Sequence, residues 1–100
     1  MELIPLGNIS DNEEFWRGTR FRIVGVGLNV KNKNDDYYEY MLTEISGNDE
    51  YMQLTNVVGN KSGSILALVK IKPDKKRLVV TGQALKFSMG LDNTYLIKED

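Results

Sequence analysis

The chain has 100 residues, of which 41% are hydrophobic and 27% are charged, and its formal net charge is −1. This length supports one domain with one modest core, and the balanced composition excludes an intrinsically disordered chain. Because histidine and cysteine are both absent, the sequence excludes disulfides, zinc–thiolate sites, thiol nucleophiles and every mechanism that needs a histidine. We therefore expect a single domain, residues 1–100, with no metal site and no cofactor.

The sequence carries no targeting or membrane signal. Residues Met1 to Leu6 lack the basic region and the long apolar region of a secretory signal. No apolar run approaches the ~20 residues that a membrane-spanning helix needs. We expect a soluble cytoplasmic protein that makes no membrane contact.

The predicted elements begin with a short helical turn and continue with strands. Ser10 and Glu13 have the spacing of a capping box, which predicts one or two helical turns before Gly18. From Thr19 onward, apolar residues recur with a period of two between turn residues, as in short antiparallel strands. The expected strands are Arg20–Val30, Tyr37–Ile45, Glu50–Val58, Ser64–Ile71, Arg77–Leu85 and Thr94–Lys98. This pattern predicts a mainly β fold, an antiparallel β-sandwich or partly open barrel of six to eight strands with one short N-terminal helical turn.

The strand expected at residues 64–71 differs from the others in composition. It is apolar without interruption from Ile65 to Val69, which is typical of a central strand covered on both faces. An unpaired edge strand of the sheet could mediate a dimer. The sequence leaves the oligomeric state open.

The charges are distributed unevenly along the chain. Between Asn34 and Asn60 there is no lysine or arginine, and the six acidic residues of this acidic stretch are Asp35, Asp36, Glu39, Glu44, Asp49 and Glu50. One interpretation is that the edges of a hairpin need solvated side chains. The other is an acidic surface that attracts and orients a basic partner.

Tyrosines accompany these carboxylates. On a strand, Tyr37 and Glu39 face one way while Tyr38 and Tyr40 face the other, so one face packs into the core and the other presents tyrosine beside carboxylate. Tyrosine is enriched in binding surfaces, although it is also a good strand former.

Aromatic and basic residues precede the first long strand. Trp16 lies between the helical turn and that strand, and we interpret it as a structural anchor whose ring plugs the end of the fold. Arg17, Arg20 and Arg22 flank it and are candidates to pair with the acidic stretch.

Two other functions remain open. The basic residues Lys70, Lys72, Lys75, Lys76 and Arg77 are candidates for a nucleic-acid-binding surface, although residues 62–85 hold no aromatic side chain on which a base could stack. A carboxylate hydrolase or a metal-dependent enzyme is the third option. Its adjacent acid pairs, such as Asp35 and Asp36, would diverge rather than converge on a strand.

Three elements follow one another along the chain. They are Trp16-Arg17-Gly18 followed by Phe21-Arg22, then Tyr40-Met41-Leu42 with Glu44, then Gly59-x-Lys61-x-Gly63-x-Ile65. Together they resemble the immunity protein 45 family of bacterial polymorphic toxin systems. The similarity runs from about Phe15 to Val69. The resemblance implies a mostly β antidote, kept in the cytoplasm of the producing cell, that catalyses nothing. It would neutralise the C-terminal toxin domain of a contact-dependent growth inhibition protein or a similar secreted effector.

The resulting hypothesis is an immunity protein that blocks the active site of a cognate nuclease toxin (RNase or DNase) with an acidic, tyrosine-bearing face. The residues expected in that face are Asp35, Asp36, Tyr37, Tyr38, Glu39, Glu44, Asp49 and Glu50. Those expected to carry the structural motif are Trp16, Arg17, Gly18, Phe21, Gly59 and Gly63. The alternative hypothesis is a small β-barrel module that binds nucleic acid.

Overall fold

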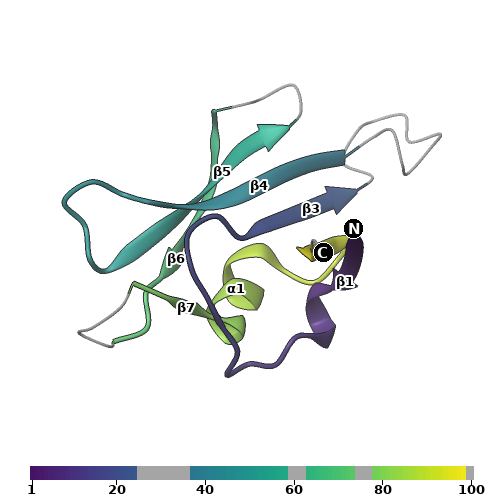
Figure 1. The fold of residues 1–100 in the computed structure, drawn as a ribbon, viewed down its shortest axis with the longest axis horizontal. Coiled ribbons are helices and arrows are strands. Elements are labelled where there is room, and N and C mark those ends of the chain that lie inside the picture. The colour runs from purple at the N-terminus through teal and green to yellow at the C-terminus, as the bar shows by residue number, and fades with distance from the viewer. Residues whose placement is uncertain (25–36, 59–62, 74–77, 99–100) are drawn as a thin grey trace.

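The computed structural model describes residues 1–24, 37–58, 63–73 and 78–98 (Figure 1). Six strands form an open antiparallel sheet in the order β1 (Glu2–Pro5), β8 (Thr94–Lys98), β3 (Arg20–Val24), β4 (Tyr37–Glu44), β5 (Tyr51–Val58) and β6 (Ile65–Lys70). A second small sheet pairs β2 (Glu14–Phe15) with β7 (Val80–Thr81). The helices are the 3-10 turn η1 (Leu6–Asn8) and α1 (Gly82–Met89). The expected mainly β, antiparallel class is confirmed.

One face of the large sheet forms the core. Side chains alternate between the two faces of β4 and β5, and the fully buried set includes Leu42, Met52 and Leu54. Phe21 from β3 and Leu85 from α1 complete the centre of this cluster. The core-facing set of β4 is therefore the one that contains Tyr38 and Tyr40, while Tyr37 and Glu39 lie on the outer face.

The N-terminal helical turn lies earlier than the capping-box spacing predicted. It is η1, whereas Ser10 to Glu13 form a hydrogen-bonded turn in which the Glu13 N–H donates to the Ser10 carbonyl at 3.2 Å. The backbone N–H of Asn12 donates to the Ser10 hydroxyl at 3.3 Å. Because β2 already begins at Glu14, no room remains for a helix after this turn.

Residues 77–85 were expected to form a strand, but most of them do not. The described part of this segment contributes the two-residue β7 and then the first half of α1. Thr81 ends the strand and caps the helix, since its side-chain oxygen accepts from the Ala84 N–H at 3.3 Å. The Gly82 N–H donates to the Glu13 carbonyl at 2.8 Å, so a loop from the other end of the chain satisfies another free donor of the helix. Helix α1 packs against β6 and β7.

Strand β6 occupies an edge of the sheet, so its expected central position is wrong. Val69 is fully buried, yet Ile65, Leu66 and Leu68 are exposed. Uninterrupted apolar sequence shows only that a strand lacks polar side chains. It does not show that a neighbour covers both faces.

Candidate protein-interaction site

The structure separates the expected acidic, tyrosine-bearing face into parts. Asp35 and Asp36 lie outside the described residues. Tyr37 begins β4 and Glu44 ends it. At about 3.3 Å per residue these two side chains lie roughly 23 Å apart. The expected residues do not form one cluster.

Glu39 is held inside the sheet rather than offered to a partner. It is 4% exposed, and the Arg22 Nη2 donates to its Oε1 at 2.7 Å. Arg20 pairs with the other carboxylate oxygen, and the Asn56 side chain donates to the Glu39 backbone carbonyl at 3.3 Å. The expected pairing of Arg20 and Arg22 with the acidic stretch is confirmed. Because both carboxylate oxygens are engaged, the role of Glu39 is to hold β3 and β4 together.

The tyrosines at this end of β4 are also occupied by the protein itself. The Arg22 guanidinium carbon lies 4.0 Å from the centroid of the Tyr37 ring, a cation–π contact. Tyr38 and Tyr40 meet edge to face on the core side, with ring centroids 6.5 Å apart. Burial raises the pKa of Tyr40.

The other end of β4 places one of the remaining expected acids, Glu44, beside an exposed aromatic ring. Trp16 is 56% exposed, and its neighbour Arg17 donates to the Glu44 carboxylate at 3.0 Å. This third ion pair was also expected. Trp16 therefore does not plug the fold as the anchor interpretation required. The neighbouring residue Phe15 is buried in the core and is the aromatic anchor of this segment.

Backbone hydrogen bonds fix the Trp16 segment against β4. The Gly18 N–H donates to the Leu42 carbonyl at 2.9 Å, and the Leu42 N–H donates to the Thr19 carbonyl at 2.9 Å. Gly18 has a φ of 91°, which an L-residue rarely adopts. The chain reverses there, so the indole ring is carried outward.

Two adjoining hollows lie beside this ring. One, of about 380 Å³, is lined by Trp16, Arg17, Glu44, Leu78 and Val79. The other, of about 440 Å³, is lined by Glu44, Leu78 and residues 45–49 of the turn between β4 and β5. Glu44 and Leu78 line both, so the hollows border each other and we treat them together as one groove. We call this groove, together with Asp49 and Glu50 at the end of the same turn, the Trp16 groove.

The turn between β4 and β5 presents Asp49 at the edge of the Trp16 groove, and Glu50 follows it directly in the chain. The Asn48 side-chain oxygen accepts from the Glu50 N–H at 2.8 Å and from the Tyr51 N–H at 3.1 Å. This side chain holds the backbone that carries Asp49 and Glu50, both of which are exposed. Among the described residues, neither of these carboxylates forms an ion pair.

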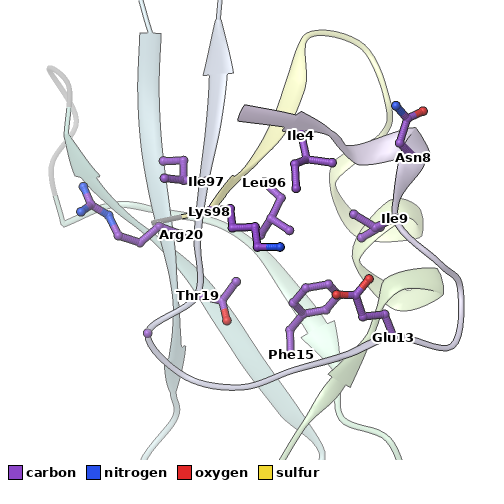
Figure 2. Close-up of a pocket in the computed structure, with 11 residues that line it drawn as sticks. Ile4, Asn8, Ile9, Glu13, Phe15, Thr19, Arg20, Leu96, Ile97 and Lys98 are labelled. Atoms are coloured by element: carbon purple, nitrogen blue, oxygen red, sulfur yellow. The ribbon is translucent and has the colours of Figure 1, made fainter. Parts of the chain in front are cut away.

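The largest hollow has a different character. It measures about 510 Å³ and lies between β1, β8 and the segment that contains β2. Figure 2 shows apolar side chains around it, among them Ile4, Ile9 and Phe15, with the Lys98 side chain in the middle of the view and Glu13 beside Phe15. Ile9 and Phe15 also belong to the buried core, so part of the wall of this hollow is core packing. Among the described residues that line this hollow, none belongs to the expected binding face.

The remaining expected residues are placed as follows. Phe21 is fully buried at the centre of the core, and Gly63 has a φ of 92°, whereas Gly59 lies outside the described residues. Of the basic candidates, Lys70 is exposed, and Lys72 donates to the Glu14 carboxylate at 2.6 Å. Lys75, Lys76 and Arg77 lie outside the described residues.

Leu78 lines both hollows of the Trp16 groove, and no pattern in the sequence pointed to it. It follows a run of charged residues, and a single leucine there carries no periodic signal. Only the pairing of β7 with β2 brings it beside Trp16.

Within the described ranges, no three acidic side chains come together in a way that could hold a metal ion, and no helix has the length and apolarity needed to cross a bilayer. Comparison of the chain with protein-family models, with curated proteins and with solved structures finds no match.

Proposed function

We propose that this chain is an immunity protein that binds a cognate bacterial toxin domain in the cytoplasm and neutralises it, with the Trp16 groove as its contact surface. The toxin class that we propose is a nuclease, RNase or DNase, of a contact-dependent growth inhibition system. In this proposal the chain catalyses nothing and acts by occupying the toxin's active site.

The observation that carries the proposal is the exposed Trp16 ring beside the Arg17–Glu44 ion pair. Tryptophan and arginine are the residue types that most often dominate the energy of protein–protein contacts. Such residues act as anchors when a partner removes them from water, and the groove beside Trp16 offers Leu78 as further apolar surface. The exposed part of the Trp16 ring contacts only water in the free protein, so a partner that covers it displaces no contact within the protein.

The acids at the edge of the groove support the choice of partner. A nuclease cleft is basic because it holds phosphates, and Asp49 and Glu50 are exposed carboxylates without an ion pair in the described part of the chain. Placed at the rim of an interface, such charges speed association and fix orientation. Glu39, Tyr37 and Tyr38, which the sequence placed in the contact face, are left out of the proposed surface because contacts within the protein already engage them.

The test is co-expression of the chain with the toxin-like domain encoded by the neighbouring reading frame. We expect rescue of growth and a complex that co-purifies. Trp16→Ala should weaken toxin binding by about 30-fold or more, since a central aromatic anchor contributes at least about 2 kcal/mol. Phe87→Ala is the matched control, because Phe87 is also an exposed aromatic residue but lies outside the groove.

The role of charge is tested by a second matched pair. Asp49→Lys should slow association and make it less sensitive to salt. Asp92→Lys makes the same change in charge at another exposed aspartate, before β8, and should bind as the wild type does. No complex and no rescue would end the proposal. Oligonucleotide binding that weakens steeply with salt would support the nucleic-acid module instead.

A further inference from the structure

The edge strand β6 and the helix α1 share an apolar surface that is separate from the Trp16 groove. On β6, Ile65, Leu66 and Leu68 are all exposed, and residues 63–69 carry no charge. Natural edge strands are usually protected by charged or covered side chains. At Ile65 and Leu66 this strand has neither kind of protection, whereas Ser88 of α1 covers the edge at the Leu68 carbonyl.

Phe87 on α1 projects from the same surface. It is 93% exposed, although the helix that carries it is fixed through the fully buried Leu85. The Ser88 hydroxyl also donates to the Leu68 carbonyl at 3.0 Å. The Phe87 side chain is therefore held on a rigid support with almost none of its ring covered.

A groove separates Phe87 from the sheet. Its volume is about 380 Å³, and Tyr51, Leu68 and Lys70 form the wall that belongs to the sheet. Phe87 and Gln83, one helical turn apart, stand on the opposite wall with Ser88. We define the β6–α1 surface as this groove together with the exposed side chains of Ile65 and Leu66.

We propose that the β6–α1 surface binds a second copy of the chain, so that Phe87 of each copy enters the groove of the other. A two-fold dimer uses the same patch on both subunits, and that patch must be complementary to itself. Here the projecting ring and a groove bordered by apolar side chains lie side by side on one surface. A two-fold axis between the two copies places the Phe87 ring of each copy in the groove of the other copy at the same time.

The charge of the surface favours a second copy over a charged partner. Lys70 is the one charged side chain among the described residues that line the groove. A basic toxin or a nucleic acid would find little charge to pair with there. The Phe87 ring of a second copy can lie over the Lys70 ammonium, a contact that gains energy as water is excluded.

Side-chain packing, rather than strand addition, is the proposed mode of contact. The Ser88 hydroxyl already occupies the outward carbonyl of Leu68, so a second strand cannot pair with β6 there without displacing α1. One aromatic side chain buries about 150–250 Å², which is about a quarter of the roughly 800 Å² that each partner contributes to a standard interface. The leucines and isoleucine of β6 add further apolar area, so we expect a reversible dimer.

The test is sedimentation equilibrium of the full chain from about 1 to about 500 μM, with circular dichroism to verify folding. We expect a monomer–dimer equilibrium that Phe87→Asp weakens by about 30-fold or more. Trp16→Asp is the matched control, because it removes another exposed aromatic ring and adds the same charge outside the surface; it should dimerise as the wild type does. This control separates the dimer from toxin binding, which Trp16 variants weaken and Phe87→Ala leaves intact.

Mixing two variants tests the reciprocal geometry. Leu68→Asp places a charge in the sheet wall of the groove but leaves the Phe87 ring in place. Phe87→Asp removes the ring but leaves the sheet wall of the groove unchanged. We expect each variant alone to be largely monomeric and their mixture to associate, since one ring and one groove wall remain. If Leu68→Asp does not fold, the sedimentation equilibrium of Phe87→Asp decides whether the dimer forms through this surface.

Several results would overturn the proposal. They are a wild-type chain that stays monomeric at every concentration, a dimer that Phe87→Asp leaves intact, and a mixture as monomeric as its components. Loss of toxin binding in Phe87→Ala would assign the surface to the toxin and would also overturn it.

Discussion

Glu39 on β4 lies directly opposite Arg22 on β3, and the Arg22 guanidinium donates to its carboxylate at 2.7 Å. A second guanidinium, that of Arg20, pairs with the same carboxylate. One buried acid therefore holds two arginines of the neighbouring strand. The outer face of the sheet at this point depends on a charge network rather than on apolar packing.

Removing this charge should destabilise the fold. Loss of one partner of a buried pair leaves the other without compensation, and Arg22 is only 13% exposed at its side chain. We expect Glu39→Gln to lower the free energy of unfolding by about 2–4 kcal/mol, measured by urea denaturation. Glu44→Gln is the control, because its pair with Arg17 is largely exposed and should contribute less than about 1 kcal/mol.

Phe15 and Trp16 are neighbours in sequence, but their substitution by alanine should affect stability to very different extents. Phe15 packs edge to face on Phe21, with ring centroids 6.5 Å apart, so Phe15→Ala should cost about 3–5 kcal/mol of unfolding free energy. Trp16→Ala should change stability by no more than about 0.5 kcal/mol, because the ring is exposed. Equal losses in thermal denaturation would contradict the exposed position of Trp16.

Gly82 should resist the substitution that normally stabilises a helix. Gly→Ala within a helix is usually favourable by about 1 kcal/mol, but a Cβ at Gly82 would lie 2.1 Å from the Ser10 carbonyl oxygen. The backbone of the Ser10 turn would have to move, so we expect Gly82→Ala to lower the free energy of unfolding by about 1–3 kcal/mol. Gly7→Ala, where a Cβ meets nothing within 4 Å, is the matched control and should be nearly neutral.

Alkaline pH should reveal the burial of Tyr40. Its pKa is raised by burial, so above the ordinary tyrosine pKa of about 10 the unfolded chain loses this proton more readily than the folded one. Stability that is fully present below pH 10 should therefore fall as the pH rises through the folded-state pKa. Tyr40→Phe should reduce this fall, measured by urea denaturation between pH 9 and pH 11 (about one unit on either side of 10). An unchanged slope would contradict the assignment.

The strands with strict alternation could be predicted closely from the sequence. Residues 94–98 form β8 with the expected bounds, and β4 and β5 differ from their predicted ranges by one residue. Alternation records which side chains are buried, and burial of one face is what specifies such strands. It does not record which strand lies beside which, so the edge position of β6 was missed.

Helix α1 was missed for a different reason. Val79, Val80 and Thr81 read as a strand, and the first two are buried as a strand would require. The helix begins only because Thr81 caps it and because the Glu13 carbonyl receives the Gly82 N–H. That second contact joins residues far apart in the sequence, so no local pattern could show it.

The candidate site was predicted in part. Pairing of Arg17, Arg20 and Arg22 with the acidic stretch followed from charge alone and is confirmed. The sequence could not show that one of those pairs is exposed and two are nearly buried. That difference separates Glu44, at the surface, from Glu39, inside the sheet.

The position of β8 between β1 and β3 determines when the sheet can be completed. As the ribosome synthesises the chain, β1 emerges first, yet its neighbour in the sheet emerges only with residues 94–98. A nascent chain that ends at Asn93 has no partner for β1 and leaves one side of β3 open. Stable assembly of this half of the protein must therefore wait for translation of its last strand.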